Sequence, residues 1–127
     1  MARNKTAGPT ERELEILRIL WDSSPGTVRQ VNEAMSEGKN VGYTTTLKLM
    51  QIMTEKRLLI RDKSGFQHIY KPAISEEKTQ KQLVGDLLEK AFSGSAEKLV
   101  MRALSAKKVS KKELTKIKKL LERIEGQ

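Results

Sequence analysis

The sequence contains no cysteine, which excludes disulfide bonds, thiolate metal sites and cysteine catalysis. It has no apolar run near the roughly 18 residues needed to cross a bilayer, and no hydrophobic segment of a secretion signal follows the opening MARNK. We therefore expect a cytoplasmic protein without membrane insertion. Aromatic residues make up only 4% of the chain, so the base-stacking platforms of single-strand and RNA binders are nearly absent.

Catalytic and metal-binding constellations are also missing from the sequence. The only histidine, His68, has no cysteine or carboxylate cluster beside it, so we interpret it as a packed or half-exposed residue rather than a ligand. No Ser-His-Asp set, glycine-rich phosphate loop or paired-carboxylate motif occurs. We expect no enzyme activity, no metal site and no cofactor.

What the sequence does contain is positive charge, with 25 Lys and Arg against 16 Asp and Glu and a net charge of +9. A balance this basic favours a polyanionic partner, most often nucleic acid. The excess is spread evenly, because residues 1–72 carry 12 basic and 8 acidic groups and residues 73–127 carry 13 and 8. The alternative is a lysine-coated soluble protein. We interpret the lysines near the C-terminus as the solvated outer face of a dimer helix, and the alternative for them is that some reach phosphates.

Two helices are predicted in the first part of the chain. Thr10 and Glu13 have the spacing of a capping box, and so do Thr27 and Gln30. A short segment with a proline and a glycine, residues 22–26, separates the two helices, and the second is expected to stop near Gly38. The residues expected on their inner faces are Leu14, Leu17, Leu20, Trp21, Val28, Val31 and Met35.

A third helix is expected from about Thr44 to Lys56, and it opens with three consecutive threonines. Helical periodicity divides its residues between two sides. The inner side contains Thr46, Leu47, Met50 and Met53. The outer side contains Thr44, Thr45, Lys48, Gln51, Ile52 and Glu55.

Two short strand-like runs follow, LLIRD and FQHIYKP, and Lys63-Ser64-Gly65 joins them as a hairpin turn. Three short helices followed by a hairpin is the order of a winged helix-turn-helix domain, which we place at residues 9–73 after a flexible N-terminus at 1–8. The predicted fold class is therefore mainly α with a small β wing, followed by an α-helical dimerisation region.

This order of elements indicates that the three threonines lie at the start of a DNA recognition helix. A recognition helix brings its first residues against base edges, where small hydroxyls fit and can donate or accept hydrogen bonds. Hydroxyls and free N–H groups at a helix start also bind phosphate. The alternative is that Thr44 and Thr45 only cap the helix and that the hairpin only closes a small core.

Residues 74–127 are predicted to form three further helices with apolar stripes, the last of them with a capping box at Ser110 and Glu113. These helices are too small to bury their stripes as a separate globule. They can fold back on the first domain or pair with a second copy, and we favour a homodimer that presents two recognition helices to a palindromic operator. The residues expected at the dimer interface are Leu87, Leu88, Leu99, Leu104, Leu114, Ile117, Leu120, Leu121 and Ile124.

Four pieces of the sequence, in order, resemble one family. They are PTERELEILRILW, YTTTLKLMQIMTEKRLL, the wing that ends at Tyr70-Lys71-Pro72, and FSGSAEKLVMRAL. Together they resemble the penicillinase-repressor family of BlaI/MecI-type regulators, over about residues 9–124. The resemblance implies a bacterial transcriptional repressor that dimerises through its C-terminal helices and binds promoter DNA.

The resemblance also implies site residues and a partner. Tyr43, Thr44, Thr45 and Lys48 would lie in or beside the major groove of double-stranded DNA, and Gln51 falls on the same outer side of the helix. Relatives of the antibiotic-response type are inactivated when a membrane-bound sensor protease triggers cleavage in the C-terminal region. The wing residues implied to lie near the DNA backbone are Arg61, Lys63 and Gln67.

The chain departs from the family pattern at three places. Arg57 stands where the family usually has glycine, just past the recognition helix, and Phe66 stands at the wing where a basic residue is common. Arg102-Ala103 replaces the Asn-Phe bond that is cut in the antibiotic-response members. Copper-responsive relatives bind metal through cysteines, which this chain lacks.

We therefore predict a homodimeric repressor that binds palindromic promoter operators. A protein of another class fits the same residues: a winged-helix interaction module whose basic surface docks an acidic partner without sequence-specific DNA binding. The two differ in sequence preference on duplex DNA, which only the first would show.

Overall fold

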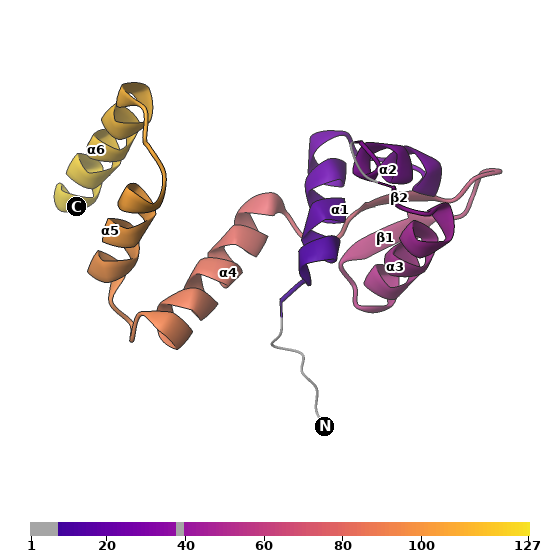
Figure 1. The fold of residues 1–127 in the computed structure, drawn as a ribbon, viewed down its shortest axis with the longest axis horizontal. Helices are drawn as coiled ribbons and strands as arrows, with labels where there is room; N and C mark the ends of the chain where they lie inside the picture. The colour runs from indigo at the N-terminus through magenta and orange to yellow at the C-terminus, as the bar shows by residue number, and fades with distance from the viewer. Residues whose placement is uncertain (1–7, 38–39) are drawn as a thin grey trace. The chain divides into compact units, whose positions relative to one another are not determined.

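The computed structural model describes residues 8–37 and 40–127, with the elements in the order shown in Figure 1. The helices are α1 (Glu11–Asp22), α2 (Val28–Met35), α3 (Tyr43–Glu55), α4 (Glu76–Ala91), α5 (Ala96–Ala106) and α6 (Lys111–Glu125). The strands β1 (Leu59–Asp62) and β2 (Ile69–Pro72) lie between α3 and α4. The predicted fold class, mainly α with a small β wing and a further helical region, is confirmed, while dimerisation stays a prediction. The second helix was expected to stop near Gly38 and ends at Met35, with Ser36 as its C-cap. Gly38 itself, and residues 1–7 of the predicted flexible segment 1–8, lie outside the described residues.

The chain divides into two compact units, one up to Leu83 and one from Val84 onward. In the first unit α1, α2 and α3 pack against one another, and the hairpin packs against α1 through β2 and against α3 through β1. Its core is formed by one buried cluster drawn from the inner faces of the helices and from both strands. The members of this cluster are Ile16, Leu17, Leu20, Val28, Val31, Met35, Met50, Met53, Leu59 and Tyr70.

Local hydrogen bonds start the first two helices as predicted. The Thr10 hydroxyl accepts from the Glu13 N–H, and the Glu13 carboxylate accepts from the Thr10 N–H. Thr27 and Gln30 form the same reciprocal pair at the start of α2. Each box satisfies backbone donors that have no partner within the helix.

The wing is a two-stranded antiparallel hairpin in which Leu59 faces Pro72 and Asp62 faces Ile69. Gly26, in the connection between α1 and α2, adds a short third pairing: its N–H donates to the Tyr70 carbonyl at 2.9 Å and its carbonyl accepts from the Tyr70 N–H at 2.8 Å. The hairpin is thereby attached to the helix-turn-helix by backbone hydrogen bonds as well as by packing.

The prediction that the second strand begins at Phe66 is wrong. Pairing stops at Asp62 and Ile69, so residues 63–68 form a loop, and Lys63-Ser64-Gly65 is only its first part. The chain leaves the sheet early because the Asp62 carboxylate accepts a hydrogen bond from the Ser64 N–H at 2.9 Å and turns the backbone away from the strand direction.

Trp21 and the first turns of α4 complete the first unit. The Trp21 indole N–H donates to the Ile74 carbonyl at 2.9 Å, and the half-buried ring packs against the core as predicted. Ser75 caps α4 by accepting from the Lys78 N–H, and Thr79 one turn later is buried. The start of α4 therefore belongs to the winged-helix unit.

In the second unit, the chain turns between α4 and α5 through Ser93 and Gly94, both with positive φ. Ser95 caps α5, and Ser110 caps α6 by accepting from the Glu113 N–H at 3.1 Å. The predicted capping box at Ser110 is only half formed, since the return bond from the Glu113 side chain is absent from this described helix.

Candidate nucleic-acid interface

The three threonines at the start of α3 divide between two environments. Thr44 and Thr45 are exposed, whereas Thr46 is fully buried at 0% exposure. Consecutive helix residues point about 100° apart, so neighbouring threonines can lie in different environments. The helix begins at Tyr43 with Gly42 as N-cap and without a side-chain cap. Thr44 and Thr45 therefore lie inside the helix and do not cap it.

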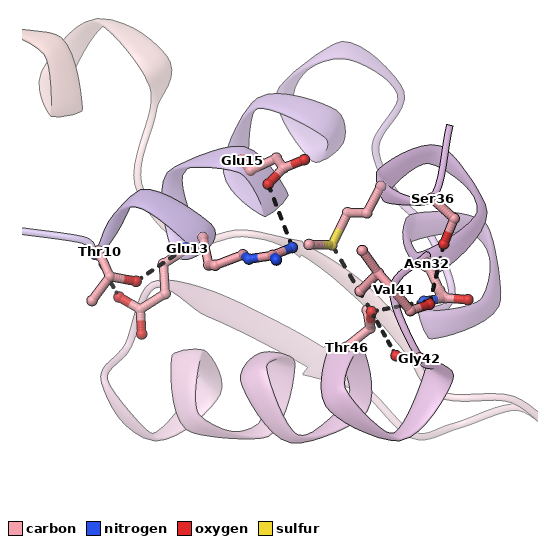
Figure 2. Close-up of polar contacts among 10 residues, drawn as sticks. Thr10, Glu13, Glu15, Asn32, Ser36, Val41, Gly42 and Thr46 are labelled. Atoms are coloured by element: carbon pink, nitrogen blue, oxygen red, sulfur yellow. Dashed lines mark hydrogen bonds and ion pairs between the residues drawn. The ribbon is translucent and has the colours of Figure 1, made fainter. Parts of the chain in front are cut away.

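Thr46 ties α3 to α2 through the polar contacts shown in Figure 2. The Asn32 side-chain amide donates to the Thr46 hydroxyl and to the Val41 carbonyl, both at 2.9 Å. Ser36 donates its hydroxyl to the same Val41 carbonyl at 3.2 Å. These bonds hold the connection into α3 and fix where the first turn of the helix lies on α2.

The exposed face of α3 is a polar stripe. Thr44, Lys48 and Gln51 are exposed at positions i, i+4 and i+7, which places them on one side of the helix. Glu55 follows one turn later and is exposed as well. Because its carboxylate would repel phosphates, the part of the stripe suited to a polyanion is confined to the first two and a half turns.

Tyr43 and Thr45 flank this stripe at its N-terminal end. Tyr43 is about half exposed, and the Arg29 guanidinium lies 5.9 Å from the centre of its ring. At that distance a cation–π attraction orients both side chains. Arg29 itself is exposed, so the pair presents a positive charge beside the start of α3.

The opposite end of α3 is stabilised by two contacts. Arg57 has a positive φ of 65° and forms a complete Schellman motif: its N–H donates to the Thr54 carbonyl, and the Leu58 N–H donates to the Met53 carbonyl. Arg57 therefore adopts the left-handed conformation that glycine would adopt more easily.

The second contact joins α3 to α1. Lys56, the C-cap of α3, places its Nζ 2.8 Å from the carboxylate of Glu13, which is only 3% exposed. That carboxylate also accepts the Thr10 N–H. The ion pair therefore satisfies a buried charge and helps to fix the angle between α1 and α3.

The predicted wing residues differ in exposure. Lys63 and Gln67 are exposed in the loop, whereas Arg61 is half-buried in β1 opposite Tyr70.

Hydrogen bonds from the Ser64 N–H and hydroxyl, with a smaller contribution from the charge of Lys71, hold the pKa of the Asp62 carboxyl below its ordinary value of 3.8. The loop turn is therefore built on an ionised carboxylate at neutral pH.

A groove of about 240 Å³ lies between the wing loop and the first residues of α2 and α3. It brings together Tyr43 and Gln67, which were predicted as site residues, with three that were not: Arg29, Phe66 and His68. A place for Arg29 near the start of the second helix could have been predicted from the sequence, because Arg29 lies two residues after the Thr27 cap, in the first turn of α2. Its position beside Tyr43 depends on how α2 and α3 pack.

The unit from Val84 onward presents an apolar surface. No residue of α5 or α6, all of which the structure describes, is buried. Of the predicted interface residues, Leu88, Leu99 and Ile117 are half-buried. The others are exposed large apolar side chains: Leu87, Leu104, Leu114, Leu120, Leu121 and Ile124.

Among the described residues, no group of three or more histidine or acidic side chains is arranged to hold a metal ion. None of the described helices has the length and apolar content needed to span a bilayer.

Residues 9–123 match the family described as penicillinase repressor. Two curated relatives, each named Transcriptional regulator BlaI, come from the Mycobacterium tuberculosis strains CDC 1551 / Oshkosh and ATCC 25618 / H37Rv, and each is 32% identical to this chain over 92 residues. The matched region covers 72% of this chain and 65% of each relative, so it spans just under two thirds of their length. The family match extends over most of the chain, which therefore belongs to the penicillinase repressor family of BlaI/MecI-type transcriptional regulators.

Proposed function

We propose that this repressor binds palindromic operators in bacterial promoters as a homodimer. The observation that carries the proposal is the polar stripe of α3, where Thr44, Lys48 and Gln51 are exposed on one side. The hydrogen bond between Asn32 and Thr46 anchors the other side of the same helix. A helix anchored in this way can enter a major groove without changing its position in the domain.

Two kinds of contact would follow from this arrangement. Thr44, Thr45, Lys48 and Gln51 would read base edges, since hydroxyl, amide and ammonium groups match the donors and acceptors of the major groove. Phosphates would be bound by Arg29, by Lys63 and by the N–H groups at the start of α3, which has no side-chain cap. Because phosphate contacts release counterions, affinity should fall steeply with salt.

Dimerisation is supported by the apolar surface of the second unit. Helix α6 carries Leu114, Ile117, Leu121 and Ile124 at spacings of three and four residues, and none of them is buried. A helix with such a stripe is stabilised when a second apolar surface covers it. A second copy of the chain supplies a matching surface by symmetry, and the two-fold axis of the pair matches the symmetry of a palindrome.

Repression would follow from occupation of the promoter, so separation of the two subunits should relieve it. A dimer gains binding strength because the second half-site contact becomes intramolecular. Cleavage of the C-terminal unit, triggered by a sensor protease, would remove this gain. Arg102 and Ala103, at the position of the cut bond in antibiotic-response relatives, are both exposed but lie within α5. A protease would have to unwind that helix to reach the peptide bond between them.

The experiment that tests the proposal selects bound sequences from a random duplex pool with the full chain. We expect an enriched palindrome with half-sites about one helical turn apart. Enrichment of no sequence, combined with binding to acidic polypeptides, would instead support the interaction module.

A pair of lysine variants then separates base reading from charge. Lys48→Ala should weaken binding to the selected operator by about tenfold, and binding to random duplex by much less. Lys119→Ala removes the same charge from α6 and should leave the ratio of specific to random binding unchanged. Equal losses on both duplexes for Lys48→Ala would indicate that this residue contacts only phosphate.

A further inference from the structure

Phe66 is the most exposed large apolar side chain among the described residues, at 109% of its reference area. A phenylalanine in water forgoes about 1.5–3 kcal/mol that burial would provide. Its side chain stabilises no part of the core cluster. The exposed ring is therefore available to contact a partner outside the chain.

The wing loop holds the Phe66 side chain away from the core of the first unit. The Asp62 carboxylate accepts the Ser64 N–H at 2.9 Å and begins the turn immediately after β1. Beyond Ser64 the loop is open, since a Cβ added at Gly65 would meet no heavy atom closer than the Gln67 carbonyl oxygen at 4.0 Å. Phe66 thus extends from a thin loop whose base is fixed to a strand.

The groove beside Phe66 contains polar and cationic side chains together with the apolar Val28 and Leu47. The groove beside it is lined on the helix side by Arg29 and Tyr43, and on the loop side by Gln67 and His68. Lys63 is exposed in the same loop. The one carboxylate of β1, Asp62, bonds to Ser64 and stays charged, so it offsets part of the positive charge of Arg29 and Lys63. A polyanionic partner that can also accept an apolar ring matches this combination, and duplex DNA has both properties because its phosphates border stacked bases.

We propose that Phe66 enters the minor groove next to the half-site that α3 contacts and inserts partly between two base pairs. This inference rests on the proposed function. Proteins that bind the minor groove often insert Phe, Leu, Ile, Met or Pro between base steps and kink the duplex. Pyrimidine–purine steps unstack most easily, so Phe66 selects TA or CA steps flanking the palindrome through their deformability.

The test uses the full chain and duplexes that share the selected palindrome but differ in the flanking step. Wild type should bind a duplex with flanking TA steps about tenfold more tightly than one with GC steps at the same places. Phe66→Ala should reduce this ratio to less than about twofold while retaining the preference for the palindrome itself. Phe66→Leu keeps an apolar wedge and should retain an intermediate ratio.

Fluorescence supplies a second readout, independent of affinity. The fluorescent base 2-aminopurine is placed in turn at each base pair outward from the half-site. Binding of wild type should raise the emission of 2-aminopurine at one step, because a base that is no longer stacked on its neighbours is less quenched. Phe66→Ala should abolish that rise. If Phe66→Ala retains both the flank ratio and the fluorescence rise, insertion of Phe66 between base pairs is excluded.

The insertion of Phe66 and the proposed function would be contradicted by different results. Absence of any sequence preference in wild type would overturn the proposed function and the wedge with it. A selected palindrome that wild type binds with no flank preference and no unstacking would overturn the insertion of Phe66 alone.

Discussion

The side-chain amide of Asn32 in α2 donates a hydrogen bond to the hydroxyl of Thr46 in α3, with 2.9 Å between Nδ2 and Oγ1. The two residues lie in the two helices of the helix-turn-helix, and Thr46 is buried directly beside the exposed Thr45. One threonine therefore orients α3 while its neighbour is exposed at the surface.

Substitution of these adjacent threonines should separate stability from binding. Thr46→Val keeps the side-chain volume but removes the acceptor of the Asn32 bond, and should lower the free energy of unfolding by about 1 kcal/mol. Thr45→Val should change stability by less than about 0.5 kcal/mol, because its hydroxyl is exposed, yet weaken specific binding to the selected operator. Urea unfolding and gel shifts measure the two effects. Equal destabilisation by both variants would contradict the assigned orientation of the helix.

Replacement of Arg57 by glycine should stabilise the protein. A non-glycine residue in the left-handed region costs about 1–2 kcal/mol, and the greater freedom of glycine in the unfolded chain offsets about 0.5–1 kcal/mol of that relief. We expect Arg57→Gly to raise the free energy of unfolding by about 0.5–1 kcal/mol. Arg57→Ala removes the same charge but retains a Cβ, and should give no gain. Equal stabilisation by both variants would attribute the effect to charge.

The contact between Lys56 and Glu13 should contribute to stability through the buried carboxylate. Lys56→Met leaves Glu13 with its backbone partner alone, and should lower the free energy of unfolding by about 1–2 kcal/mol, less than for a wholly buried pair because the lysine is partly exposed. The double variant with Glu13→Gln should lose less than the sum of the two single losses. Lys63→Met, in the exposed loop, serves as control and should have little effect. Additive losses in the cycle would show that the two side chains do not interact.

The Asp62 carboxyl should titrate below its ordinary pKa of 3.8, because the two hydrogen bonds from Ser64 favour its charged form. The folded-state pKa is lowered, so the stabilisation is fully present above the unfolded value and is lost as the pH falls through the folded value. Carboxyl chemical shifts recorded against pH should give a lower midpoint for Asp62 in the folded chain than in urea. Identical midpoints would mean that the turn is not formed in solution.

The features that were predictable from sequence depend on near neighbours. The capping boxes at Thr10 and Thr27 need only residues three positions apart, and the inward direction of Thr46 follows from helical periodicity. The start of β2 was missed because it depends on pairing with Asp62 across the hairpin, whereas Phe66 by itself has the composition of a strand residue. The place of Arg29 beside Tyr43 likewise depends on packing between two helices. The predicted DNA contacts and dimer interface involve a second molecule, and they remain predictions.

Leu121 in α6 should be required for the homodimer. It is 55% exposed, so Leu121→Lys should leave the single chain folded with unchanged helix content, since both residues are good helix formers. A lysine buried in an apolar interface would weaken dimerisation by about tenfold or more, because a buried charge without a partner is costly.

Thr115→Lys adds the same charge on the opposite side of α6 and serves as the matched control. Sedimentation velocity should show dimers for wild type and for Thr115→Lys but a shift to monomers for Leu121→Lys, which should also bind the full palindrome no more tightly than a single half-site. Dimers that persist in Leu121→Lys would place the interface on another surface.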